Sequence, residues 1–210
     1  MEEKLKGLLR EGIEICSPGT ESAKLERLYD EITLFNPAYK LVAASGEELV
    51  RRHILDCLAP VTIIREYICS IENPHGADLG SGSGLPGLVL ASAMEDVHFT
   101  LVERMGRRAG FLRSTSALCA LKENTRVLEK DLAEVNESFD FVVFRAFRPL
   151  KDIITDLRRI VRSYVFIYKS SDENIKAEIE AAGDEFECTV RSYTVPFLEA
   201  ERNLLILKRK

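Results

Sequence analysis

The chain has 210 residues, of which 46 % are hydrophobic and 30 % charged, the balance of an ordinary globular protein of one large domain. A net charge of −5 argues against nonspecific binding of nucleic acid over the whole surface, so an RNA partner requires a local basic face. No run approaches the roughly 20 apolar residues of a membrane span, and the charged N-terminus is unlike a secretory signal. Five scattered cysteines lack metal-ligand spacing, so we expect a cytoplasmic protein without membrane or metal binding.

Residues 1–70 are expected to form a cap of three or four helices, because apolar residues recur there at helical spacing. The recurring positions are Leu25, Leu28, Ile32 and Phe35, then Leu49, Val50, Ile54 and Leu58, and then Ile63, Ile64, Tyr67 and Ile68. Pro37 and Pro60 are expected to punctuate these segments. No flexible linker follows, so we expect the cap to pack directly on a second domain of residues 71–210.

From residue 76 onward, short β-branched and aromatic runs alternate with helical patterns. The predicted strands are residues 98–103, 125–129, 139–146 and 164–169, and an earlier strand near "HGADL" is placed by topology more than by composition. An apolar stripe from Leu150 to Val161 predicts a helix, and "FECTVRSYTVP" with "RNLLILKRK" predicts an antiparallel edge hairpin. The pattern indicates an α/β fold with a mostly parallel sheet and helices on both faces.

The glycine-rich stretch "ADLGSGSGLPG", residues 77–87, allows two ligand interpretations. Residues 82–87 match the G-x-G-x-x-G pattern of dinucleotide-binding loops. Residues 78–84 match the acidic-x-G-x-G-x-G loop typical of S-adenosylmethionine (SAM) binding. The second match is favoured, because it places the loop directly after Asp78 and Leu79 and puts Pro86 at the opening of the helix. An NAD-binding loop and a glycine-rich turn without a ligand are the alternatives.

Acidic residues at two successive strand ends fit the SAM interpretation. Asp78 suits the cationic amino group of SAM, whereas it would repel a pyrophosphate. Glu103 follows the glycines by about 20 residues, at the position where an acidic side chain accepts hydrogen bonds from ribose hydroxyls. A solvated surface glutamate is the alternative for Glu103. The candidate cofactor-binding residues in these two segments are Asp78, Gly80, Gly82, Gly84 and Glu103.

Five segments of the chain occur together, in the same order, in one enzyme family. They are "RRHILDCL", "DLGSGSGLPG", "GRRAGFLR", "FDFVVFRAF" and "VPFLEAERNLLILK". From about residue 24 to its end, the chain resembles the small-subunit ribosomal RNA guanine-N7 methyltransferase family, methyltransferase G, also named glucose-inhibited division protein B. The resemblance implies a Rossmann-like class I SAM-dependent methyltransferase fold and methylation of a guanine N7 in 16S rRNA.

The resemblance also implies partners and contacts. The implied substrate is 16S rRNA, alone or in a small ribosomal subunit or assembly intermediate; another RNA, a small molecule, or a non-catalytic dinucleotide-binding module is the alternative. The implied SAM contacts are Gly80, Leu85, Leu132, Ala133 and Arg145, with Glu103 at the ribose. The chain departs from the family pattern at Lys40-Leu41-Val42, where relatives have Asn-Leu-Thr, and at Asp131, where an arginine is common.

Guanine N7 carries a lone pair and no proton, so its methylation needs alignment rather than a general base. After "FDFVV" the chain has neither the Asn-Pro-Pro-Tyr motif used on exocyclic amines nor the Pro-Cys nucleophile used on pyrimidine carbons. Arg145 stands there instead and is the candidate catalytic residue. At the end of the fourth strand it is expected to face the cofactor pocket and to bind the SAM carboxylate or orient the base. An arginine in solvent is the alternative.

The candidate substrate-binding residues are His53, Arg107, Arg108, Arg113, Phe147 and Arg148. The arginines of "RMGRRAGFLR" lie near one helix start and are expected to contact RNA phosphates, with a solvated charged face as the alternative. Phe147 is expected either to stack on a flipped guanine or to belong to the core. His53 and Asp56 share a helix face and either line the substrate cleft or form a satisfied structural pair.

Overall fold

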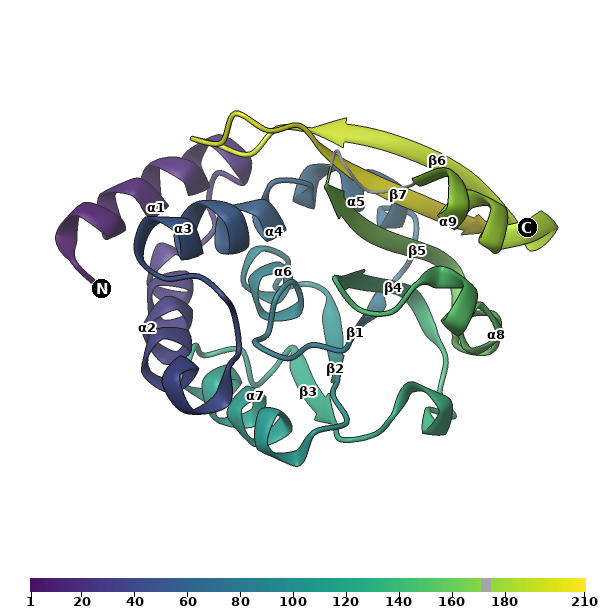
Figure 1. The fold of residues 1–210 in the computed structure, drawn as a ribbon, viewed down its shortest axis with the longest axis horizontal. Helices are drawn as coiled ribbons and strands as arrows, with labels where there is room; N and C mark the ends of the chain where they lie inside the picture. The colour runs from purple at the N-terminus through teal and green to yellow at the C-terminus, as the bar shows by residue number, and fades with distance from the viewer. Residues whose placement is uncertain (171–174) are drawn as a thin grey trace.

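A twisted seven-stranded sheet forms the centre of the computed structural model, which describes residues 1–170 and 175–210 (Figure 1). The strands are β1 (His75–Leu79), β2 (His98–Val102), β3 (Thr125–Leu128), β4 (Phe139–Arg145), β5 (Val161–Ser170), β6 (Phe186–Tyr193) and β7 (Arg202–Arg209). Their order is β3-β2-β1-β4-β5-β7-β6, with β1 to β5 parallel and β7 antiparallel to both β5 and β6. The mostly parallel sheet and its antiparallel C-terminal edge hairpin are confirmed.

Helices α1 to α5 precede the sheet in the chain. They are α1 (Glu3–Cys16), α2 (Ser22–Tyr39), α3 (Gly46–Leu49), one turn of π-helix η1 (Val50–Leu55), α4 (Asp56–Leu58) and α5 (Val61–Ile68). Pro37 does not separate two helices as expected but lies in the last turn of α2. The helix ends two residues later, where Lys40 takes a left-handed conformation and the Asn36 side chain accepts from the N–H groups of Leu41 and Val42.

The remaining helices alternate with the strands. They are α6 (Gly87–Ala93), α7 (Gly106–Leu118), η2 (Leu132–Glu134), α8 (Leu150–Ile160), α9 (Ile175–Ala182) and η3 (Gly183–Glu185). The helix predicted to reach Val161 stops at Ile160, because Val161 is extended and pairs with Phe139 of β4. In the described parts of the chain, no helix has both the length and the apolar character that crossing a lipid bilayer requires.

Side chains of β4 alternate between the two faces of the sheet. Phe141 and Val143 join a buried cluster with the N-terminal helices, α6 and α7, while Val142 and Phe144 join a second cluster with α8. In Figure 1, α1, α2 and α7 accordingly lie toward the left and α8 and α9 toward the right. This two-sided burial explains why the strands of the sheet read as nearly continuous apolar runs.

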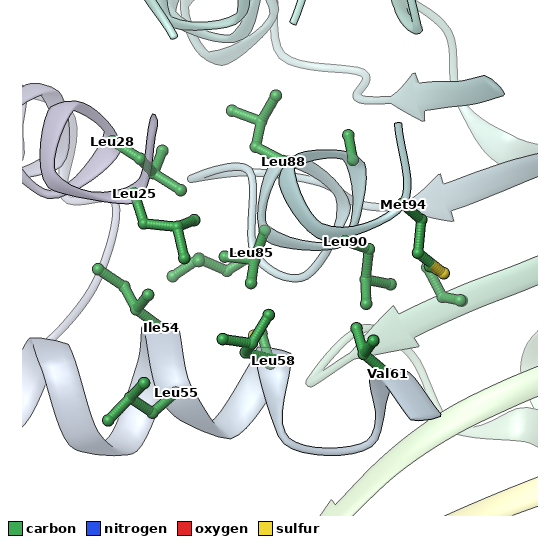
Figure 2. Packing of buried hydrophobic residues seen from close by; sticks show 14 of the residues in the cluster. Leu25, Leu28, Ile54, Leu55, Leu58, Val61, Leu85, Leu88, Leu90 and Met94 are labelled. Carbon is green, nitrogen blue, oxygen red and sulfur yellow. The ribbon is translucent and has the colours of Figure 1, made fainter. Parts of the chain in front are cut away.

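The N-terminal helices share one apolar core with α6. Figure 2 shows Leu25 and Leu28 of α2 facing Leu85 and Leu88, while Leu58 and Val61 face the same region from below. Leu58 has no exposed surface. The division into a cap (residues 1–70) and a catalytic domain (residues 71–210) stays a prediction, and the shared core predicts that the two unfold together.

Leu58→Ala is expected to lower the free energy of unfolding by about 2–5 kcal/mol, because it opens a cavity where the cap meets α6. Unfolding should remain one transition by circular dichroism and by tyrosine fluorescence in urea, since both parts share that core. Leu34→Ala is the matched control, because Leu34 is 69 % exposed and should change stability by less than about 0.5 kcal/mol. Two separate transitions in the wild type would contradict a shared core.

Candidate active site

The loop between β1 and α6 depends on glycine at three positions. Gly80, Gly82 and Gly84 have φ angles of +68°, +50° and +83°, in the left-handed region that other residues avoid. A Cβ at position 80 would also run into the ring of Phe147. Because these glycines have no side chains, a ligand can lie close to the backbone of the loop.

A cleft of about 270 Å³, hereafter the first cleft, opens at the carboxyl ends of β1 to β4. Its walls are Leu79, Gly80, Val102, Glu103, Arg104, Met105, Arg108, Lys130, Asp131, Leu132, Ala146, Phe147 and Arg148. In open α/β sheets this edge is where ligands bind. Of the predicted cofactor residues, the structure brings Gly80, Glu103 and Leu132 to the wall of this cleft.

Glu103 is buried at the end of β2 with its carboxylate fixed by two backbone donors. The Gly82 N–H donates to Oε2 at 3.0 Å, and the Met105 N–H donates to Oε1 at 2.8 Å. The side chain thus joins the glycine loop to the next strand end while still lining the first cleft. The alternative of a solvated surface glutamate does not match this position.

Asp78 lies beneath the loop and outside the wall of the first cleft. It is 1 % exposed, and the Gly87 N–H donates to its Oδ2 at 3.0 Å, while Oδ1 has no hydrogen-bond partner in the described residues. Burial raises the pKa of this carboxyl from 3.8 to about 7. Asp78 therefore organises the start of α6, and its direct contact with SAM stays a prediction.

Four other predicted cofactor residues also lie off the wall of the first cleft, and one of them, Gly82, bonds the Glu103 carboxylate. Leu85 belongs to the buried core, and Gly84 packs closely against Leu88. Ala133 is exposed beside Leu132, and its N–H donates to the Asp131 side chain at 3.3 Å. Their contacts with SAM stay predictions that follow from the family resemblance.

A neighbouring cleft of about 310 Å³, hereafter the second cleft, lies between the N-terminal helices and the ends of β4, β5, β6 and β7. Its walls are Glu48, Arg52, His53, Asp56, Arg145, Ala146, Tyr168, Lys169, Ser170, Tyr193 and Arg202. Ala146 lines both clefts, and its φ of +50° turns the chain sharply after β4. The two clefts therefore meet at the end of β4.

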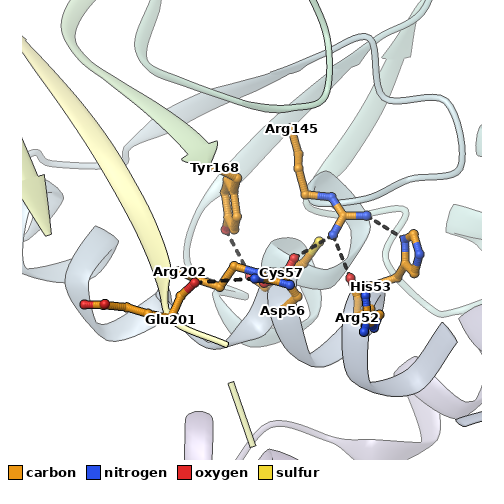
Figure 3. A network of polar contacts seen from close by, with 8 residues as sticks. All are labelled: Arg52, His53, Asp56, Cys57, Arg145, Tyr168, Glu201 and Arg202. Atoms are coloured by element: carbon orange, nitrogen blue, oxygen red, sulfur yellow. Dashed lines mark hydrogen bonds and ion pairs between the residues drawn. The ribbon is translucent and has the colours of Figure 1, made fainter. Parts of the chain in front are cut away.

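Arg145 lines the second cleft, although the sequence places it facing the cofactor pocket. Its Nη1 donates to Asp56 Oδ2 at 2.8 Å and to the Arg52 carbonyl at 3.0 Å (Figure 3). Its Nη2 lies 2.6 Å from His53 Nδ1. The buried Asp56 carboxylate explains the difference, because a charge removed from water needs an opposite charge beside it.

Asp56 accepts from a second arginine as well. Arg202, at the start of β7, donates from Nε to Asp56 Oδ1 at 3.2 Å, so one carboxylate joins α4 to two strands (Figure 3). Burial raises the pKa of Asp56 above its usual value, although both guanidinium groups oppose that shift. The Tyr168 hydroxyl fixes the same helix by donating to the Cys57 carbonyl at 2.9 Å.

His53 stands in the π-helical turn η1, a feature common at functional sites. The Asp56 backbone N–H donates to the His53 carbonyl, and Arg145 links the two side chains, so both residues line one cleft and belong to one network. Burial, together with the charges of Arg145 and Arg52, lowers the pKa of His53 to about 4. The imidazole is therefore neutral at pH 7.

Of the four arginines predicted to contact RNA, two line the first cleft and two lie outside its wall. Arg108 and Arg148 line the first cleft together with Phe147, and Arg148 lies 5.1 Å from the centre of the Phe147 ring. Arg107 instead lies over the Tyr39 ring at 5.5 Å, and Arg113 pairs with Glu129 at 2.8 Å. The four arginines do not converge on one point.

Several wall residues were not singled out from the sequence. They are Met105, Lys130 and Asp131 in the first cleft and Tyr193 and Arg202 in the second. The first three follow β2 or β3 within three residues, so position after a strand was the available signal. Asp131 bonds Arg148 at 2.8 Å across the first cleft mouth, and the Tyr193 hydroxyl is buried without a partner among the described residues.

Comparison with solved structures identifies the fold. A human methyltransferase 10 domain containing protein superposes with a TM-score of 0.59 at 14 % identity, over 88 % of this chain and 95 % of that one. A predicted O-methyltransferase from Agrobacterium tumefaciens gives a TM-score of 0.56 at 22 % identity, over 71 % and 80 %. These likenesses show that the chain has the class I, Rossmann-like fold of these methyltransferases.

Sequence comparison then gives the family. The family described as rRNA small subunit methyltransferase G matches residues 21–205. Proteins named ribosomal RNA small subunit methyltransferase G are 31 % identical in Alteromonas mediterranea, over 100 % of this chain and 99 % of that relative, and 31 % identical in Treponema denticola, over 98 % and 93 %. The chain belongs to the rRNA small subunit methyltransferase G family, and the resemblance noted from its motifs is confirmed.

Asp78→Asn is expected to change how stability depends on pH. Folding raises the pKa of Asp78, so its contribution to the free energy of unfolding depends on pH. The contribution of the neutral carboxyl is fully present below about pH 4 and is lost as the pH rises through about 7. Asparagine stays neutral, so the wild type should lose up to about 4 kcal/mol relative to the variant between pH 4 and pH 8.

Urea unfolding of both proteins at five pH values in this range measures that difference. The exposed Asp184, changed to asparagine, is the control. A difference between wild type and Asp78→Asn that stays constant from pH 4 to pH 8 would contradict a carboxyl that is neutral when folded.

Proposed function

We propose that the protein transfers a methyl group from SAM to N7 of a specific guanine in 16S rRNA. The cytoplasm is its proposed location, and naked rRNA, the small ribosomal subunit or an assembly intermediate its partner. Membership of the rRNA small subunit methyltransferase G family supports this proposal. The observation that carries it is the meeting of two clefts at Ala146, which gives a donor and a target base adjoining sites.

The residues of the first cleft fit SAM. Apolar Leu79, Val102 and Leu132 line it beside the Glu103 carboxylate, a combination suited to a nucleoside with a hydroxylated sugar. The missing Cβ at Gly80 keeps the loop clear of Phe147. When bound, SAM supplies an electrophilic methyl group on sulfonium, and the sulfur keeps the electron pair of the broken S–C bond.

The second cleft is the proposed site of the target guanine. The Tyr193 hydroxyl, which has no partner in the described part of the chain, and the network of His53, Arg145 and Asp56 supply polar groups that a base can use. Guanine N7 forms the new N–C bond with its lone pair and releases no proton, so no side chain has to act as a base. Holding the base in line is the contribution of these residues, and positioning of this kind supplies about 7–11 kcal/mol.

Arginines around the first cleft mouth are the proposed RNA phosphate contacts. Arg107 is exposed and Arg113 lies farther along the same helix, while Arg108 and Arg148 stand at the mouth itself. This local distribution is compatible with a net charge of −5, because phosphate contact depends on nearby cations rather than on the charge of the whole chain.

Glu103→Gln is expected to weaken SAM binding about 10- to 100-fold, because hydrogen bonds from ribose hydroxyls to a carboxylate are stronger than those to an amide. Isothermal titration calorimetry of SAM and of NAD against the wild type and the variant measures this. Glu123→Gln is the matched control, since Glu123 lies at a third cavity at the opposite edge of the sheet. Tight NAD binding by the wild type would instead identify a dinucleotide-binding module.

Deleting the gene is expected to leave one 16S rRNA guanosine without its N7-methyl group, because this protein is the proposed source of that methyl group. Mapping of N7-methylguanosine in rRNA from cells with and without the protein measures this, and expression of the wild-type chain should restore the mark. An unchanged rRNA map would overturn the proposed substrate.

A further inference from the structure

We propose that His53 is a specificity-determining residue that donates a hydrogen bond from Nε2 to O6 of the target guanine. In the same proposal, Arg145 is the positioning residue that fixes the tautomer of His53. The inference rests on the proposed function, because it assigns roles within the second cleft. It adds to that function the means by which guanine is told from adenine.

The tautomer follows from the contact between the two side chains. A guanidinium has only donors, so the Nδ1 atom of His53, 2.6 Å from Arg145 Nη2, must accept. A neutral imidazole that accepts at Nδ1 carries its proton at Nε2. Within residues 1–170 and 175–210, Nε2 has no hydrogen-bond partner, so this donor is available to a ligand.

The surroundings keep His53 neutral and hold Arg145 in place. Arg52 and Arg145 both disfavour a second proton on the ring, as does burial. Asp56, 8 % exposed at its side chain, holds Arg145 at Nη1 and is itself held by Arg202. The Nε2 atom of His53 therefore stays a protonated donor, and Arg145 holds its ring in one orientation, as a contact that determines specificity requires.

The chemistry of the purine edge matches a single fixed donor. Guanine presents two acceptors there, N7 and O6, whereas adenine replaces O6 with an amino donor. A donor aimed at O6 leaves the N7 lone pair free for the methyl group and places two donors face to face if adenine enters. Methylation leaves the base positively charged, so a neutral donor also avoids adding a like charge beside it.

A double-mutant cycle between the protein and the base tests the contact. One substrate is 16S rRNA with guanosine at the mapped position, and the other is the same RNA with 2-aminopurine there, made by splinted ligation. The base 2-aminopurine keeps N7 but has hydrogen in place of O6. For the wild type, kcat/KM should fall about 10- to 100-fold on 2-aminopurine. His53→Leu should lose a similar factor on guanosine and no further factor on 2-aminopurine.

His98→Leu is the matched control, because His98 is exposed at the third cavity and should leave both rates as in the wild type. If kcat/KM fell by the same factor from guanosine to 2-aminopurine for the wild type and for His53→Leu, the proposed contact would be wrong. A wild type that methylates no guanosine would instead overturn the proposed function, so the two failures are distinct.

Nitrogen-15 NMR of the free wild type tests the tautomer without any substrate. The His53 ring should show a protonated Nε2 and an unprotonated Nδ1, and Arg145→Leu should convert this into a mixture of tautomers. A proton on Nδ1 in the wild type, or an unchanged tautomer in Arg145→Leu, would overturn the inference even where a His53 variant fails to fold.

Discussion

The buried carboxylate of Asp56 is the constraint on which the site depends. It lies between Arg145 at the end of β4 and Arg202 at the start of β7, and it belongs to a helix from the N-terminal region. A buried charge left without a compensating partner costs about 3–5 kcal/mol. Three distant segments therefore take one arrangement, and the orientation of Arg145 and His53 follows from it.

The two clefts are built from different parts of the chain. Gly80, with its left-handed backbone, and the Glu103 carboxylate line the first, and a polar network supported by the N-terminal helices lines the second. Ala146 is the boundary because the chain turns there directly after β4. In the proposed function, a methyl donor and an acceptor base on either side of this residue need no large motion to meet.

Much of the fold was predictable because its signals are local. Strands β2 to β5, the edge hairpin and the glycine loop follow from short runs of side chains, and Glu103 and Leu132 do line the first cleft. The direction of Arg145 was not predictable, because its partner Asp56 is 89 residues away in the chain. The bond from the Gly87 N–H to Asp78 was not predicted, because the sequence does not show that the carboxylate turns under the loop toward the start of α6.

The bond between Asp56 and Arg202 joins residues separated by 146 positions, more than two thirds of the polypeptide. During synthesis, which proceeds from the N-terminus, the early helices and the first five strands emerge well before the strand that carries Arg202. The bond from Arg202 to Asp56 can therefore form only after nearly the whole chain has been synthesised. The second cleft is the last part of the fold to be completed, because β7 supplies one of its walls.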